Sequence, residues 1–188
     1  MNQGEIPDPI SVAMTMAYFG FVPIPLSGRS KVPAIKKWEQ TKMEDALEIV
    51  TKKVSSGQAN NIGVLCGRPS NFVAIDVDSK NGLEKWFQLI YQNCLPETFT
   101  VLTGSSGYHY YFQYDERTSK LHNGLIRGMN IDFKTTGGQL VAPGSIHPTT
   151  GLLYAVCGGY DYLNNSQVPV PKIAPMPDWL YQLVLSNQ

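Results

Sequence analysis

The sequence has no excess of positive or of negative charge. Its 188 residues include 15 Lys and Arg and 15 Asp and Glu, so the formal net charge is +0. This balance excludes a strongly basic domain, the simplest electrostatic sign of nucleic-acid binding, so any contact with nucleic acid has to be local. With 43% hydrophobic residues, the chain can bury a core, and we expect residues 1–188 to form one domain of two lobes.

The sequence also lacks paired cysteines and any uninterrupted apolar segment of membrane-spanning length. The three cysteines are odd in number and far apart, and we interpret them as reduced cytosolic thiols because no C-x-x-C pair begins a zinc site. Residues 9–28 carry no charge, but Gly20, Pro23 and Pro25 break this stretch, which therefore does not form a transmembrane helix. The first ten residues lack the basic start and apolar run of a signal peptide. We expect a cytoplasmic protein without membrane contact.

The motifs of several enzyme classes are absent as well. No strand–GxxxxGK[ST]–helix unit is present, which excludes a P-loop NTPase. The G-x-S-x-G elbow of many serine hydrolases and the H-E-x-x-H motif of zinc proteases are also lacking. Any catalytic site therefore has to combine residues from separate segments of the sequence.

Apolar spacing predicts four helices. The first has Asp8 as its N-cap and ends at Gly20. Thr41 and Asn81 are each followed three residues later by Glu, which predicts a capping box at the start of the second and third helices. A short fourth helix surrounds Trp179 near the end of the chain.

Alternating polar and apolar residues predict an antiparallel sheet structure. Two pairs of strands would form β-hairpins, 62–66 with 72–78 and 130–135 with 139–142, because residues typical of turns separate them. Further strands are expected at 21–26, 99–103, 108–114 and 152–156.

Asp76 and Asp78 share one face of the strand predicted at 72–78. Like charges about 4 Å apart repel by roughly 4 kcal/mol at an effective dielectric constant near 20, so something must offset this repulsion. Water, shared protonation, a neighbouring lysine or divalent cations would each do so, and carboxylate oxygens suit Mg²⁺ or Mn²⁺. The pair alone does not decide among these, since such pairs also commonly end strands.

Other polar residues are candidates for a site, although each also has an ordinary structural interpretation. His109 alternates with tyrosines on a strand, and Asp132 and Lys134 share one face of another. His147 lies in a turn, and residues 104–107 form a small polar loop. Only their order along the chain makes these residues informative together.

That order resembles the catalytic core of the archaeo-eukaryotic primase superfamily, and most closely the bifunctional primase-polymerase family of plasmids and phages. The resemblance covers roughly residues 18–160. It implies an α+β primase-polymerase fold, in which an N-terminal α/β module joins an RRM-like antiparallel sheet and the active site lies in the cleft between them. The matching segments include G-F-V-P-I-P-L, K-V-P-A-I-K-K-W, N-I-G-V-L-C-G, V-A-I-D-V-D, T-G-S-S-G-Y-H-Y-Y-F, I-D-F-K-T-T-G-G-Q-L-V-A-P-G-S-I-H-P and G-L-L-Y.

The resemblance also implies roles for particular residues. Asp76, Asp78 and Asp132 match the family's metal-binding acids, which would hold two divalent ions, Mg²⁺ or Mn²⁺. His109 matches its nucleotide-binding histidine and completes the expected catalytic set. Many relatives have Gly-Gly or a Ser two positions before this histidine, so a serine contact with phosphate would move here to Ser105 or Ser106. The expected nucleotide-binding residues are Lys31, Ser105, Ser106, His109, Lys134, Ser145 and His147.

The implied function is template-dependent nucleotidyl transfer in DNA replication. Its partners would be a single-stranded DNA template, a primer, and NTPs or dNTPs, with a helicase or primase-accessory domain in the same or another chain. The resemblance suggests a plasmid- or phage-encoded protein, and the chain can be part of a larger replication protein. Two alternatives stay open: a primase-like replication initiator that binds nucleotide or DNA with little catalysis, and a metal-dependent phosphodiesterase in which His109 is a ligand or proton donor.

Overall fold

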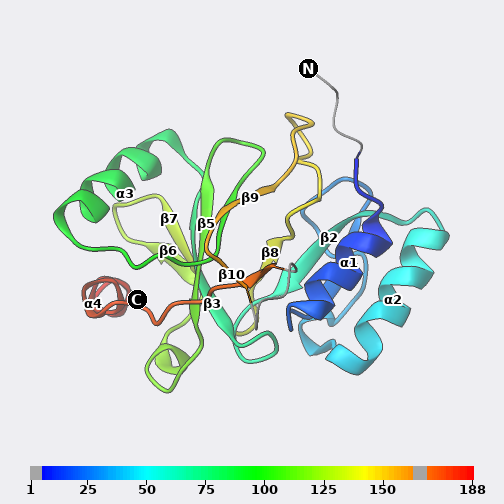
Figure 1. Ribbon diagram of the computed structural model, residues 1–188, viewed down its shortest axis with the longest axis horizontal. Helices are drawn as coiled ribbons and strands as arrows, with labels where there is room; N and C mark the ends of the chain where they lie inside the picture. Colours follow the sequence, from blue (N-terminus) through cyan, green and yellow to red (C-terminus); the bar gives the residue numbers. More distant parts are fainter. Residues whose placement is uncertain (1–5, 163–168) are drawn as a thin grey trace.

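The chain has an α+β fold in which helices flank antiparallel sheets (Figure 1). The computed structural model describes residues 6–162 and 169–188. The helices are α1 (Pro9–Tyr18), α2 (Met43–Ser55), α3 (Lys80–Gln92) and α4 (Asp178–Leu185), with short 3-10 helices η1 (Trp38–Gln40) and η2 (Thr118–Lys120). The strands are β1 (Pro23–Ser27), β2 (Ala59–Leu65), β3 (Phe72–Val77), β4 (Thr100–Leu102), β5 (Tyr108–Gln113), β6 (Gly124–Ile126), β7 (Ile131–Lys134), β8 (Gln139–Val141), β9 (Ala155–Gly158), β10 (Tyr160–Tyr162) and β11 (Pro169–Pro171).

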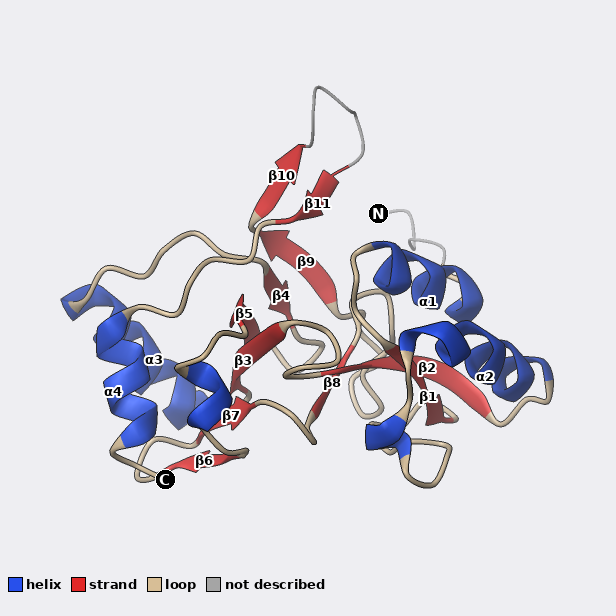
Figure 2. Cartoon of the chain, turned by 90° about the horizontal axis from the view of Figure 1, so that it is seen from below, coloured by secondary structure: helices blue, strands red, loops and turns tan. Residues whose placement is uncertain are grey.

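Two sheets organise the molecule. A three-stranded sheet has the order β1-β2-β8, and a six-stranded sheet has the order β6-β7-β3-β5-β4-β9. All pairings between named strands are antiparallel. In Figure 2 the three-stranded sheet lies with α1 and α2 on one side of the molecule, and the six-stranded sheet lies with α3 and α4 on the other. The separate pair β10-β11 projects beyond β9. This arrangement matches the predicted α/β module and RRM-like sheet.

The smaller module forms around two helices that each bury one face. Helix α1 begins where the sequence predicts, because Asp8 Oδ2 accepts the backbone N–H of Ser11 at 2.9 Å and Pro9 occupies the first turn. Both helices turn an apolar stripe toward β1 and β2. The buried residues of these stripes are Val12, Ala13, Met16, Ala46 and Val50.

Strand β3 separates two hydrophobic cores, as its alternating sequence predicts. Val73, Ile75 and Val77 face the core under α3 and α4, where Trp86 is fully buried. Phe72 and Ala74, on the other face, belong to the core shared with the smaller module. Asp76 lies on this second face but near the end of the strand, outside the apolar contact between the modules.

Both predicted β-hairpins are wrong, and both mark places where the chain crosses between sheets. Strand β2 pairs with β1 and β8, whereas β3 pairs with β5 and β7. In the same way β7 belongs to the larger sheet and β8 to the smaller one. The two crossings lie side by side, since Cys66 N donates to Gly138 O at 2.9 Å. The turn residues change the direction of the chain, but each flanking strand pairs with strands that are distant in the sequence.

Both predicted capping boxes are also wrong. Helix α2 follows Lys42, whose side chain makes no capping hydrogen bond, instead of Thr41. Helix α3 follows Ser79, whose Oγ accepts the backbone N–H of Gly82 at 2.9 Å, so Asn81 already lies inside the helix. The short connection after β3 places Ser79 at the cap. Strands β1 and β9 begin two and three residues later than predicted, at Pro23 and Ala155.

The position of this cap can be tested by its effect on stability. Ser79→Ala is expected to lower the free energy of unfolding by about 1 kcal/mol, because the N–H of Gly82 loses its acceptor. Asn81→Ala, at the exposed position that the sequence pattern favours, should change it by less than about 0.5 kcal/mol. Urea unfolding of the two variants measures both values. Equal losses would contradict the assignment of Ser79 as the N-cap.

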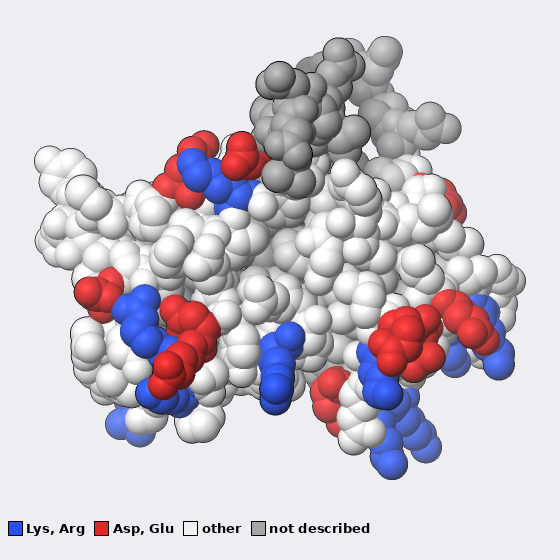
Figure 3. All heavy atoms as spheres, turned by 60° about the horizontal axis from the view of Figure 1, so that its bottom comes forward, with Lys and Arg blue, Asp and Glu red and all other residues white. Residues whose placement is uncertain are grey.

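Charged side chains of both signs are mixed on one face of the molecule. On the face drawn in Figure 3, acidic and basic groups lie next to each other in most clusters. Among the described residues, Arg117 forms ion pairs with both Asp115 and Asp178. Within residues 6–162 and 169–188, no helix is both long enough and apolar enough to span a bilayer.

Candidate active site

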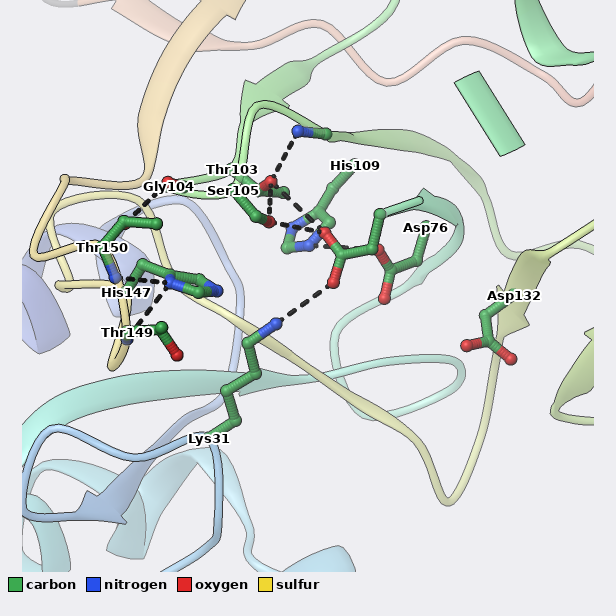
Figure 4. Close-up of polar contacts among 12 residues, drawn as sticks. Lys31, Asp76, Thr103, Gly104, Ser105, His109, Asp132, His147, Thr149 and Thr150 are labelled. Atoms are coloured by element: carbon green, nitrogen blue, oxygen red, sulfur yellow. Dashed lines mark hydrogen bonds and ion pairs between the residues drawn. The ribbon is translucent and has the colours of Figure 1, made fainter. Parts of the chain in front are cut away.

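Three of the predicted site residues form a row across the larger sheet. Strand β3 lies between β5 and β7, and Asp76 pairs directly with His109 on one side and with Asp132 on the other. Residues directly opposite in an antiparallel pair project from the same face. Residues far apart in the sequence are therefore brought onto neighbouring strands, and Asp76, His109 and Asp132 are labelled in Figure 4. Asp78 follows immediately beyond the end of β3.

Asp76 is a largely buried acid. Its Oδ1 lies 3.5 Å from His109 Nε2, beyond ordinary hydrogen-bond distance, and has no hydrogen-bond partner among the described residues. Burial, together with repulsion from the Asp78 and Asp132 carboxylates, raises the pKa of Asp76 to about 7. The fold therefore holds this carboxyl group where its charge is poorly stabilised in the protein alone.

His109 is also buried and electrically neutral. Burial lowers its pKa to about 3, although the nearby Asp78 carboxylate acts in the opposite direction. Its Nδ1 has no hydrogen-bond partner among the described residues. His109 is therefore a neutral hydrogen-bonding group and not a positive charge at neutral pH.

Asp78 joins the two modules through an ion pair. Its Oδ2 lies 3.1 Å from the Nζ of Lys31, which comes from the loop after β1 (Figure 4). Although burial acts in the opposite direction, the Lys31 ammonium group lowers the pKa of Asp78. Lys31 is held in turn through its backbone, since its carbonyl accepts a hydrogen bond from Gln139 Nε2 at 3.0 Å.

The polar loop between β4 and β5 wraps around the other oxygen of Asp78. Ser105 Oγ donates to Asp78 Oδ1 at 3.1 Å, and Thr103 Oγ1 donates to the same atom at 3.3 Å. Thr103 Oγ1 also accepts the backbone N–H of Gly107 at 2.9 Å. Ser106 instead forms the turn, with a positive φ of 66°, and its N–H donates to Thr103 O. Of the two predicted serines, only Ser105 contacts the acidic residues.

Asp132 is set apart from the other two acids. Figure 4 shows its carboxylate away from that of Asp76, and its Oδ2 lies 3.5 Å from Lys134 Nζ. Within the described parts of the chain, no three His, Cys, Asp or Glu side chains lie close enough together to hold a metal ion. In this arrangement lysines contact two of the three acids, and among the described residues Asp76 is the one acid of the three that has a buried carboxylate oxygen without a partner.

The segment that contains Ser145 and His147 borders the site from the smaller module. Ser145 Oγ exchanges two hydrogen bonds of 3.0 Å with the backbone of Ile62, which anchors the segment to β2. A contact of Ser145 with a triphosphate stays a prediction. His147 Nδ1 accepts the N–H groups of Thr149 and Thr150, both at 3.3 Å. Because Nδ1 is the acceptor, the neutral ring carries its hydrogen on Nε2.

A cavity of about 130 Å³ lies between the two sheets, and four of the predicted site residues, Lys31, Asp76, His109 and Lys134, line it. Sequence reasoning missed Thr103, Gln139 and Tyr154 as site residues. All three lie within segments that carry the family resemblance, but only the folded chain shows what their side chains face. The residues that line the cavity are Lys31, Asp76, His109, Lys134, Gln139, Leu140, Val141 and Tyr154.

Comparison with known proteins identifies the family. The model of the family described as bifunctional DNA primase/polymerase, N-terminal, matches residues 13–179. A search of curated proteins finds no match. The family match extends over most of the chain and includes every candidate residue from Lys31 to His147. The chain therefore belongs to the family of bifunctional DNA primase/polymerase N-terminal domains, which indicates nucleotidyl transfer of the primase/polymerase type.

Proposed function

We propose that this protein is a template-dependent nucleotidyltransferase that synthesises primers, extends DNA strands, or does both. Its substrates would be a single-stranded DNA template, a primer, and NTPs or dNTPs. The row of Asp132, Asp76 and His109 across three neighbouring strands is the observation that carries the proposal. In this reaction a 3′-hydroxyl attacks the α-phosphorus of a nucleotide and pyrophosphate leaves, so the site must align the reactants and offset their negative charge.

The lysines of the site supply positive charge from both modules. Lys31 approaches from the smaller module and Lys134 from β7, and both line the cavity. In the structure they contact Asp78 and Asp132. A triphosphate that enters would compete with these carboxylates for the ammonium groups. Neutral His109 and His147 would add hydrogen bonds, which orient phosphate oxygens without adding charge.

The acids of the site fit divalent ions by their chemistry. Carboxylate oxygens are preferred ligands of Mg²⁺ and Mn²⁺, and the unpartnered Oδ1 of Asp76 is a buried oxygen of this kind. Asp76, Asp78 and Asp132 are the residues that would hold two such ions, once Asp78 and Asp132 leave their lysines. The ions would activate the attacking hydroxyl and stabilise the charge on the leaving group.

The proposal is tested by incorporation of labelled nucleotides on a single-stranded template, with and without a primer, in Mg²⁺ and in Mn²⁺. Wild-type protein is expected to form product, and Asp132→Asn is expected to lower the rate by at least about 10²-fold. Asp132 side-chain atoms are substantially exposed, so this change should leave the fold intact. Glu48→Gln on the exposed side of α2 is the matched control and should retain the wild-type rate.

The other outcomes identify the alternatives. Nucleotide binding by a folded wild-type protein without incorporation would contradict the proposal and support a binding module. Strand cleavage without added nucleotides would support a phosphodiesterase. Full activity in Asp132→Asn would contradict the role of this acid, even if the protein proved to be a polymerase.

A further inference from the structure

Buried polar atoms without partners gather at the cavity between the sheets. Six buried side-chain nitrogen or oxygen atoms of the described residues have no hydrogen-bond partner. Four of them belong to residues that line this one cavity: Asp76 Oδ1, His109 Nδ1, Gln139 Oε1 and the Tyr154 hydroxyl. Leaving a buried polar group unpaired costs about 1–3 kcal/mol, so such a concentration indicates that water or a polar ligand completes the site.

Tyr154 is held rigidly at the wall of this cavity. Its N–H donates to Ser145 O at 2.9 Å, and its carbonyl accepts the N–H of Gly144 at 2.8 Å. Its ring lies between two site histidines, with centroids 5.7 Å from His109 and 6.0 Å from His147. The side chain is only 1% exposed. Backbone and ring are therefore fixed, while the hydroxyl group makes no hydrogen bond of ordinary geometry to the described residues, although it lies near enough to the Lys31 ammonium group to interact with it.

The hydroxyl group of Tyr154 is a hydrogen-bond donor at neutral pH. Burial raises its pKa, although nearby Lys31 acts in the opposite direction, so the group keeps its proton. Asp78 and Tyr154 in turn raise the pKa of Lys31 against the effect of its burial, so Lys31 keeps its charge. A hydroxyl donor and an ammonium group therefore lie close together at the cavity.

Gln139 fits at the same cavity because the neighbouring strand has a glycine, Gly63, opposite its side chain. Gln139 lies on β8, and a Cβ added to Gly63 of the neighbouring strand β2 would come within 2.7 Å of Gln139 Oε1. Glycine at position 63 therefore makes room for the carboxamide group. The sequence thus preserves space for polar groups here, at the contact between the modules, where apolar packing would otherwise be expected.

The size and charge of the cavity indicate which part of a nucleotide it receives. Pockets that enclose a whole small-molecule ligand measure about 300–1,000 Å³, whereas this cavity measures about 130 Å³. It can therefore take one group of the nucleotide and not the base and sugar together. Lys31 and Lys134 place two ammonium groups at its wall, which favours a phosphate group over a neutral base.

We propose that Tyr154 is a nucleotide-binding residue whose hydroxyl group donates a hydrogen bond to a phosphate group of the incoming nucleotide inside this cavity. The identity of the ligand rests on the proposed function. The position of the hydroxyl group rests on the structure alone. Tyr154→Phe removes only the oxygen atom and keeps the ring that packs against His109 and His147.

Binding can be measured separately from catalysis. The probes are an α,β-methylene deoxynucleoside triphosphate, whose reacting bond is blocked, and inorganic triphosphate, both titrated calorimetrically in Mg²⁺. Tyr154→Phe is expected to weaken the binding of both probes by about tenfold, the effect of losing one hydrogen bond to a charged group. In incorporation assays the same variant should raise KM for the nucleotide by a similar factor, with a smaller change in kcat.

Tyr111→Phe is the matched control. Tyr111 is fully buried, and its hydroxyl also lacks a partner among the described residues, but it does not line the cavity. This variant should keep wild-type affinity for both probes. A similar loss in the two variants would show a general effect of the substitution and overturn the proposal.

The remaining outcomes separate this proposal from the proposed function. Weaker nucleotide binding with unchanged binding of inorganic triphosphate would place the hydroxyl at the base or sugar and overturn the proposal. Unchanged binding of both probes in Tyr154→Phe, or failure of the wild-type protein to bind either, would also overturn it. Tenfold weaker binding of both probes, in a protein that does not incorporate nucleotides, would support the role of Tyr154 while contradicting the proposed polymerase activity.

Discussion

Asp76→Asn is expected to abolish nucleotide incorporation while making the metal-free protein more stable. The rate should fall by about 10³-fold or more, because the substitution removes the central acid of the row between His109 and Asp132. Stability should rise because Asn fills nearly the same volume without the charge that burial and the neighbouring acids disfavour. A catalytic loss with a gain in stability cannot be explained by unfolding.

The expected gain in stability depends on pH in a defined direction. The pKa of Asp76 is raised from 3.8 to about 7 in the fold, so folding disfavours the ionised carboxylate. The resulting destabilisation is absent below pH 3.8, grows as the pH rises toward 7, and is complete above about pH 7. Relative to wild type, Asp76→Asn should gain about 1–3 kcal/mol at pH 8 and little at pH 4. Urea unfolding in EDTA measures both values, and lower stability of the variant at pH 8 would contradict the prediction.

Asp115→Ala provides the opposite control. The Asp115 carboxylate accepts the N–H of Thr118 at 2.8 Å, and bonds from Thr118 lower the pKa of Asp115 although burial acts in the opposite direction. Removing this acid should lower the free energy of unfolding by about 1 kcal/mol and leave incorporation unchanged. The two acids therefore have opposite effects on stability, and only Asp76 is expected to affect the reaction.

The sequence predicts most helices and strands of this fold. It does not predict that two of the turns connect strands of different sheets. Alternation along 72–77 correctly assigns Val73 and Asp76 to opposite faces, because that pattern depends only on strand geometry. The turns near Gly67 and Gly137 have the composition of hairpin turns, yet each leads from one sheet to the other. The choice depends on strands far away in the sequence, such as β1 and β5, and local turn chemistry carries no information about them.

The candidate site shows the same division. The order of the motifs predicts that Asp76, His109 and Asp132 belong to one site, and the structure places them in one row. Their roles stay predictions, since position alone does not demonstrate chemistry. The contacts of Thr103 and Tyr154 depend on how a loop and a turn fold against strands from elsewhere in the chain, so spacing in the sequence could not identify them.

Gly107→Ala is expected to damage the site through the backbone without altering any charged residue. A Cβ at this position would collide with Val77 O and lie 2.9 Å from Asp78 Oδ1, so the loop or the carboxylate must move. Movement would also disturb the bond from Gly107 N to Thr103 Oγ1, and through it the contacts that hold Asp78. We expect incorporation to fall by about 10²-fold and the free energy of unfolding to fall by about 1–3 kcal/mol.

Gly124→Ala separates this local effect from a general effect of replacing glycine in the larger sheet. Gly124 lies on β6, and a Cβ added there meets no atom within 4 Å, so activity and stability should stay close to wild type. Incorporation has to be measured at a temperature at which circular dichroism shows Gly107→Ala to be folded. Wild-type rates in folded Gly107→Ala would show that the position of Asp78 tolerates displacement, and would contradict its assignment as a precisely held acid of the site. A loss confined to Gly107→Ala would instead connect the close approach of this loop to the reaction, since the two substitutions add the same methyl group and differ only in what it meets.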